Sequence, residues 1–395
     1  MEVFYTGNKI FFFYNNNIEF DPGKNEVCIN GKKVTFDSEK YPSSEEYAIQ
    51  HMRHTYREVL SRQYENIVVL TGAGSSVGIG KEEAIGKTMA GLWEEVEKTL
   101  GKEALAKYSQ KAKCNTESKN LEELLSMASL AATFLPDDEM QNTTDEIKKI
   151  IQKNCRLTLT DDAPHSLFIR KLTSRKLKYS RVKLFTLNYD LLFEQAASKG
   201  GYVIIDGFSF NTPRLFNGTN FDYDIVTRNS QHSIAEENFF PKVFHLYKVH
   251  GSLDWEKQAD GTFAKKDEPN NPVMIYPSSQ KYEASYEQPY FEMISRFQQE
   301  LRNRNTLFIV IGFSFGDKHI KAMIDEAINL NPSLTMVVVS PDVKDPNKYL
   351  DLKDKTNSMK NILLINANFS DFVASFPYSD IYDYSETGDE DNDTI

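Results

Sequence analysis

The sequence predicts an α/β fold with a Rossmann-like parallel sheet and helices on both faces. Short apolar runs alternate with longer segments of helical periodicity; the runs lie at residues 66–71, 182–187, 244–249, 306–311, 334–339 and 361–365. Runs that are apolar throughout are typical of strands covered on both sides, as in a parallel sheet. Glycine-rich or polar residues directly follow four of these runs. In such sheets ligands bind beyond the carboxyl ends of the strands, so we expect these four segments to meet at one site.

Helical spacing predicts the elements between the strands. We expect helices at residues 42–63, 89–112, 120–135, 139–154, 164–177, 190–198, 284–303 and 317–329, and a short strand at 272–276. Two segments interrupt the alternation: a helical insertion at about 100–160 and an irregular insertion at about 200–242, which is rich in Gly, Asn, Phe and Tyr. Residues 1–40 read as a small N-terminal β extension, with turn signals at Asn30-Gly31 and in the asparagine run 15–17.

Composition excludes several classes of protein. The net charge is −11, but residues 380–395 hold seven carboxylates and no Lys or Arg, which leaves −4 for the rest of the chain. We read residues 379–395 as a disordered acidic tail, and the body as lacking the basic face that direct nucleic-acid binding needs. No apolar run reaches ~18 residues, so no membrane span is expected. Three widely spaced cysteines favour a reducing, cytoplasmic location.

The glycine-rich run at residues 72–80 is the most specific local signal. It follows the apolar run 66–71 directly, which is the setting in which backbone N–H groups approach a pyrophosphate. The dinucleotide pattern G-x-G-x-x-G fails here, because Val77 stands where its third glycine belongs. The run alone therefore indicates a phosphate-binding turn without identifying the ligand.

The four segments together resemble the sirtuin-like NAD-binding family. Four motifs occur in the family's order: G-A-G-x-S at Gly72, Ala73, Gly74 and Ser76; T-x-N-x-D at Thr186, Asn188 and Asp190; H-G at His250 and Gly251; and G-x-S at Gly312 and Ser314. The resemblance covers roughly residues 64–370 and implies a sirtuin-like catalytic domain at residues 41–378, with NAD+ as its substrate.

The resemblance also implies a role for each matched residue. His250 would be the base that accepts a proton from a ribose hydroxyl or from water, which suits an imidazole with its ordinary pKa of ~6.5. Asn188 would hydrogen-bond the ribose and a water. The remaining matched residues would contact the nucleotide, with the pyrophosphate at the first four; they are Gly72, Ala73, Gly74, Ser76, Thr186, Asp190, Gly251, Gly312, Ser314 and Asp317.

Each assignment has a structural alternative. Asn188 and Asp317 are also suited to capping the helices that follow them, and Asp190 and His250 could serve only the fold. His165 and His319 stand at expected helix starts, and we take both as structural.

Departures from the family pattern reduce the number of activities that the resemblance implies. No cysteine follows Cys155, so the four-cysteine zinc module of protein-deacetylating sirtuins has no counterpart, and no zinc is expected. The segments Gly86-Lys87-Thr88-Met89 and 314–320 resemble those of the bacterial antiphage branch of sirtuin-like proteins, whose members hydrolyse NAD+. That branch implies an NAD+ hydrolase; some of its members act beside a HerA-type ATPase, some beside an Argonaute-like protein and some alone. A catalytic domain with a short β extension most resembles the kind with a HerA-type ATPase partner, and we expect a homo-oligomer. A protein-lysine deacylase and a non-catalytic nucleotide-binding scaffold remain as alternatives.

Overall fold

A computed structural model describes residues 9–12, 16–81, 84–115, 119–134, 137–227, 238–275, 288–343, 345 and 348–378. The expected acidic tail at residues 379–395 lies outside these ranges. Among the helices that are described, none is long and apolar enough to cross a membrane.

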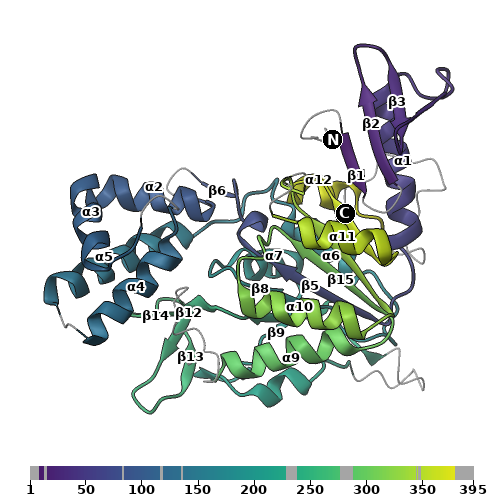
Figure 1. The fold of residues 1–395 in the computed structure, drawn as a ribbon. Helices are drawn as coiled ribbons and strands as arrows, with labels where there is room; N and C mark the ends of the chain where they lie inside the picture. Colours follow the sequence, from purple (N-terminus) through teal and green to yellow (C-terminus); the bar gives the residue numbers. More distant parts are fainter. Residues whose placement is uncertain are drawn as a thin grey trace.

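A parallel sheet forms the centre of the molecule, as the sequence predicts (Figure 1). Its strands in spatial order are β17 (Ile362–Ile365), β16 (Leu334–Val339), β15 (Thr306–Ile311), β5 (Asn66–Thr71), β8 (Lys183–Thr186), β11 (Val243–Lys248) and β9 (Val203–Ile205). The order reverses direction at β5, because the next strand along the chain, β8, lies on one side of it while β15 lies on the other. Such a reversal is where ligands bind in doubly wound sheets.

Helices cover both faces of this sheet, which confirms the predicted layering. One hydrophobic core joins the sheet to α1 (Ser44–Leu60), α6 (His165–Thr173), α7 (Leu192–Gly200) and α12 (Phe369–Ser375). The core on the opposite face joins it to α9 (Tyr290–Arg302), α10 (Lys318–Leu330) and α11 (Leu350–Ser358). Successive residues of β5 point to opposite faces of the sheet. Val69 packs into the first core, and Val68 and Leu70 pack into the second. The sequence analysis did not predict α11 or α12.

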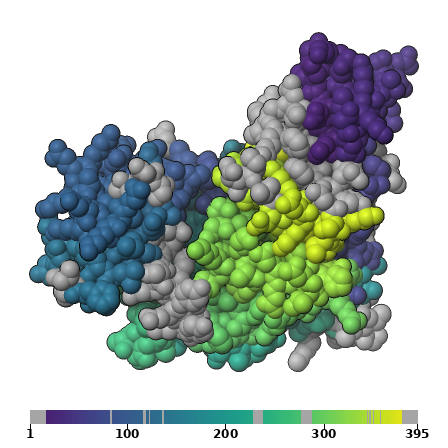
Figure 2. Space-filling model, in the orientation of Figure 1, coloured from purple at the N-terminus to yellow at the C-terminus, as the bar shows by residue number. Residues whose placement is uncertain are grey.

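The N-terminal β extension continues the central sheet. β1 (Lys9–Phe12) pairs antiparallel with β17 and is followed outward by β2 (Asn16–Asp21), β3 (Glu26–Ile29) and β4 (Lys32–Val34). Helix α1 begins at its N-cap Ser43 and buries Ala48 and Met52 in the same core as Ile18 of β2. The extension therefore shares a core with the rest of the fold while its tip projects from the body (Figures 1 and 2).

Helices α2 (Met89–Leu100), α3 (Lys102–Lys111), α4 (Leu121–Phe134) and α5 (Asp138–Cys155) form a unit to one side of the sheet (Figure 1). They enclose a third core around Trp93, Val96 and Ile147. The prediction of one helix over 89–112 was wrong, because Gly101 adopts a φ of +87° and separates α2 from α3. This core also takes in Leu253 and Tyr189, so the helical unit packs against the segments after β8 and β11.

A second, four-stranded sheet lies beside the carboxyl edge of the first. It consists of β10 (Arg214–Leu215), β13 (Phe263–Lys265), β12 (Gly251–Lys257) and β14 (Pro272–Met274), in that order. The sequence analysis predicted only the last of these. The sheet makes β12 the direct continuation of the chain after β11, with His250 at the junction.

Candidate functional site

The carboxyl ends of four neighbouring strands bring the four predicted segments to one edge. The pairing aligns Ile311 of β15 with Thr71 of β5, Thr71 with Thr186 of β8, and Thr186 with Lys248 of β11. The glycine-rich turn, the Asn188 loop, His250 and the loop at Gly312 each begin within two residues of those positions. The predicted site residues thus come from four separate parts of the chain to one edge of the sheet.

The glycine-rich turn packs backbone against backbone on the Gly312 loop. The N–H of Gly72 donates to the carbonyl of Ile311 at 2.9 Å, and the N–H of Gly74 to the carbonyl of Gly312 at 3.1 Å. A Cβ on Gly74 would lie 2.5 Å from the Cα of Gly312, and Gly312 itself has a φ of +60°. Residues 73–75 then form a 3-10 turn, η1. These glycines are required for the close approach of the two loops, whatever ligand they hold.

Asn188 fastens the next loop to this turn. Its side-chain Nδ2 donates to the carbonyl of Gly72 at 2.9 Å, and lies 3.1 and 2.9 Å from the hydroxyls of Ser75 and Ser76. Its backbone N–H donates to the hydroxyl of Thr186 at 3.1 Å. Within the described residues Oδ1 of Asn188 has no protein partner, so it is the atom that a substrate group or water would meet. These bonds go to the glycine-rich turn, so the Asn188 side chain does not cap helix α7.

Asp190 lies beneath the same turn and is only 7% exposed. One carboxylate oxygen accepts from the hydroxyl of Ser76 at 2.7 Å, and the other accepts from the N–H of Leu192 at 3.1 Å, at the start of α7. These bonds join the glycine-rich turn to a helix start. The contacts therefore favour the structural alternative for Asp190, with Ser76 as its partner.

His250 faces a carboxylate. Its Nε2 lies 3.3 Å from Oδ2 of Asp317, and the two side chains are 12% and 8% exposed. The other oxygen of Asp317 accepts from the N–H groups of His319 and Ile320, at 3.0 and 3.2 Å, so the predicted helix cap at Asp317 is confirmed. Gly251 follows with a φ of +89°, and a Cβ there would lie 2.2 Å from the carbonyl of Val273. The structure thus gives Asp317 two functions, capping α10 and holding the His250 ring.

Ser314 is exposed between two buried aromatic residues. Phe313 and Phe315 pack their rings 4.9 Å apart, and Phe315 takes a φ of +59°. Ser314 is exposed to solvent, while the phenyl rings on either side of it anchor the loop in the core. An exposed hydroxyl on an anchored loop is suited to contact a ligand.

Comparison with known families agrees with this geometry. Residues 182–360 match the model of the SIR2-like domain. The match runs from the start of β8 into the region after α11, so it includes Asn188, His250 and Asp317, while the glycine-rich turn precedes it. It supports a sirtuin-like family and an NAD-related function for the chain. No curated protein matches the sequence.

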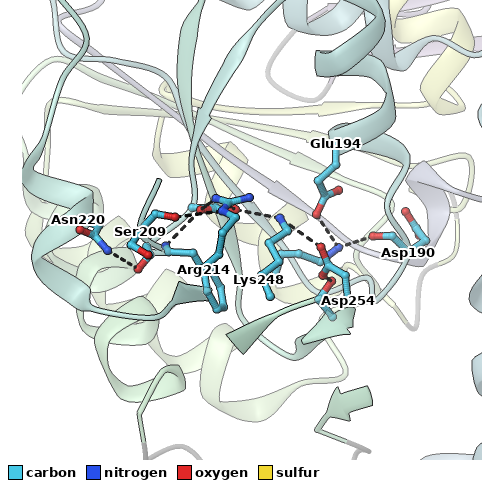
Figure 3. A network of polar contacts seen from close by, with 12 residues as sticks. Asp190, Glu194, Ser209, Arg214, Asn220, Lys248 and Asp254 are labelled. Atoms are coloured by element: carbon cyan, nitrogen blue, oxygen red, sulfur yellow. Dashed lines mark hydrogen bonds and ion pairs between the residues drawn. The ribbon is translucent and has the colours of Figure 1, made fainter. Parts of the chain in front are cut away.

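The sequence analysis missed a buried lysine within the matched residues 182–360. Lys248, at the end of β11, is 2% exposed and donates to the carbonyl of Asp190; its Nζ also lies 3.2 Å from a carboxylate oxygen of Glu194 (Figure 3). Burial raises the pKa of Glu194, against the attraction of Lys248. A lysine that ends an otherwise uncharged, fully buried strand is the signal that could have revealed it.

Two other histidines of the chain are buried away from solvent. Burial lowers the pKa of His165 to about 4 and that of His245 to about 3. His165 packs edge-on against Phe193 and Phe369, with ring centroids 4.8 and 5.2 Å away, and both its ring nitrogens lack a hydrogen-bond partner among the described residues. It belongs to the core, in line with the structural role predicted for it. The described residues contain no group of three or more His, Cys, Asp or Glu arranged to hold a metal ion.

Proposed function

We propose that this protein is an NAD+ hydrolase that cleaves the bond between nicotinamide and ribose. The observation that carries the proposal is the placement of Asn188 and His250 at the ends of the neighbouring parallel strands β8 and β11, beside a glycine-rich turn. The match to the SIR2-like domain supports NAD+ as the nucleotide. In this proposal residues 41–378 form the catalytic domain, residues 1–40 its β extension and residues 379–395 a tail.

The reaction would need little covalent chemistry from the protein. Nicotinamide leaves as a neutral molecule when the C1′–N bond breaks, and the ribose develops positive charge that a water oxygen then neutralises by bonding to C1′. The proton lost by that water passes to His250, whose imidazolium is stabilised by the carboxylate of Asp317 at 3.3 Å. The products are ADP-ribose, nicotinamide and a proton.

Asn188 would position the attacking water or a ribose hydroxyl through its side-chain oxygen. Nδ2 donates to the carbonyl of Gly72 and lies within hydrogen-bond distance of the hydroxyls of Ser75 and Ser76. The orientation of the amide is therefore fixed before the substrate binds. A fixed acceptor costs no reorganisation during the reaction. The exposed Ser314, on the loop that packs against the turn, would contact the adenosine ribose.

We further propose that the hydrolase acts as an antiphage effector by depleting NAD+, as a homo-oligomer and with a HerA-type ATPase as partner. The motif resemblance at residues 86–89 and 314–320 supports this role. An enzyme that consumes its host's NAD+ must be held inactive until needed, so assembly, the partner or an infection signal would gate it.

The test is to incubate the purified chain with NAD+, alone and with a co-expressed ATPase, and to identify products by chromatography and mass spectrometry. ADP-ribose and nicotinamide are expected, and His250→Ala should lose them. His54→Ala, at an exposed histidine of α1, is the matched control and should retain activity. NAD+ binding without turnover under both conditions would favour the scaffold, and dependence on an acylated peptide would favour the deacylase.

A further inference from the structure

Lys248 is buried at the point where the two catalytic loops meet. Its Nζ donates to the carbonyl of Asp190, lies 3.4 Å from the carbonyl of Tyr189 and makes an ion pair with Glu194 at 3.2 Å. Figure 3 shows the lysine reaching from β11 toward Asp190 and Glu194. The hydrogen-bond and ion-pair partners described for this ammonium therefore belong to the segment that carries Asn188 and begins α7.

The groups that Lys248 joins lie close in the sequence to Asn188 and to His250. The two carbonyls belong to the residues immediately after Asn188, and Lys248 stands two residues before His250. One ammonium thus ties the backbone that carries Asn188 to the strand that delivers His250. Hydrogen bonds to a charged donor are stronger than neutral ones, and a buried charge holds its partners closely because they replace its water.

Backbone bonds also join this loop to the chain around His250, since the carbonyl of Thr186 accepts from the N–H of Val249, but none of those described uses the carbonyl of Asp190. The carbonyl of Tyr189 also accepts from the N–H of Leu253, in β12 beyond His250. The side chain of Asp190 bonds to Ser76 and to the start of α7, so it fixes the loop to the turn and the helix. Among the contacts described, the carbonyl of Asp190 is joined to β11 through Lys248.

We propose that Lys248 is a positioning residue that sets the distance between Asn188 and His250, and thereby the rate of turnover more than the binding of NAD+. The inference rests on the proposed function, because it concerns the same reaction. Groups that must share one reacting centre lose rate steeply when displaced. The glycine-rich turn is bonded to Asn188 and Asp190, but two backbone hydrogen bonds to Ile311 and Gly312 also hold it in place without Lys248.

A second lysine in the same region, with a side chain 15% exposed, provides the control. Lys265 of β13 lies 2.8 Å from Asp206, which directly follows β9, and 3.2 Å from Asp254 of β12. Its contacts lead toward Arg214, on the opposite side of the network from Asp190 (Figure 3). Removing it leaves Asp206 and Asp254 with one partner fewer, while the hydrogen bonds of Lys248 to the Asn188 loop stay in place.

The experiment compares Lys248→Met, Lys265→Met and the double variant Lys248→Met/Glu194→Gln. Each is measured for thermal unfolding, for kcat and for KM with NAD+. The double variant removes both members of the ion pair, so it should regain stability lost by Lys248→Met, because no buried carboxylate is left alone. We expect its kcat to stay about 100-fold below wild type with KM changed by less than about threefold, and Lys265→Met to keep a near-normal kcat.

Two results would overturn the proposal. Recovery of kcat together with stability in the double variant would mean that Lys248 serves only folding. An equal loss of kcat in Lys265→Met would mean that the whole network matters and that Lys248 has no special position.

A readout that does not depend on turnover separates this inference from the proposed function. Hydrogen exchange of a peptide covering residues 186–192 should be faster in the double variant than in Lys265→Met, since the carbonyls of Tyr189 and Asp190 have lost their contacts with Lys248. If the wild-type chain never hydrolyses NAD+, the proposed function fails while this comparison still decides the positioning role. Equal exchange in the two variants would refute it.

Discussion

Acid should destabilise this protein well before its carboxylates titrate. His165 has a pKa of about 4 in the folded chain and an ordinary value near 6.5 when unfolded. Below pH 6.5 the unfolded chain therefore binds the extra proton and the folded chain does not, so stability falls as the pH falls toward 4. The full difference is about 3.4 kcal/mol, and about 2 kcal/mol of it is lost between pH 7 and pH 5.

His245 adds to this loss by the same mechanism. Its pKa of about 3 in the fold contributes about another 2 kcal/mol between pH 7 and pH 5. Together the two histidines remove about 4 kcal/mol, a large part of the 5–15 kcal/mol that roughly spans the stability of folded domains. The raised pKa of Glu194 has the opposite effect, because it makes the folded state more stable as the pH falls. This contribution is the same in wild type and in the histidine variants, so it cancels in their comparison.

The assay is urea unfolding at several pH values between 5 and 6.5. Over this range each buried histidine should contribute an average slope of about 1 kcal/mol per pH unit, so His165→Leu should lower the slope of the free energy of unfolding by that amount. His54→Leu removes a histidine whose side chain is 68% exposed and should leave the slope unchanged. A His165→Leu slope equal to that of wild type would refute the reasoning. The pH at which the protein begins to unfold is also the lowest pH at which the activity of His250 variants can be measured.

Three further substitutions test the site and the fold. Gly312→Ala would place a Cβ 2.4 Å from the Cα of Gly74 and should abolish NAD+ binding, whereas Gly78→Ala, at a φ of +78° with open space, should cost about 1 kcal/mol and retain binding by calorimetry. Asn188→Ala should lower kcat about 100-fold in a product assay; a change in KM alone would contradict its role at the reacting centre. Lys171→Met removes three hydrogen bonds to carbonyls near the end of α12 and should lower the free energy of unfolding by about 2–4 kcal/mol in urea; an unchanged midpoint would argue against that anchor.

The central sheet was predictable because each strand is a local signal. The runs at β5, β15 and β16 are apolar almost throughout and end in a glycine or a turn, and the order of a parallel sheet follows from few topological rules. The convergence of the four segments then follows from geometry alone. The cap at Asp317 was equally local, since an aspartate before a helix accepts from the N–H groups two and three residues ahead.

The small second sheet was not predictable in the same way. Its strands are two to seven residues long, and β12 carries an aspartate and a tryptophan that are both buried only because β13 and β14 pair on either side of it. Such pairing depends on contacts far apart in the sequence. Lys248 was missed for the same reason, because its partners Asp190 and Glu194 lie more than fifty residues away. The His250–Asp317 contact likewise joins two loops that only the fold brings together.

The close packing of Gly74 against Gly312 limits how the sequences of related proteins can change. Each glycine occupies space that the other's backbone denies to a side chain, so a single substitution at either position meets a clash that the partner cannot relieve. Selection on folding alone would then preserve both. A descendant without the proposed hydrolase activity would still keep the two glycines, while its residues at the positions of Asn188 and His250 could change. Under this proposal, related sequences that keep both glycines but lack these two side chains are expected to be inactive.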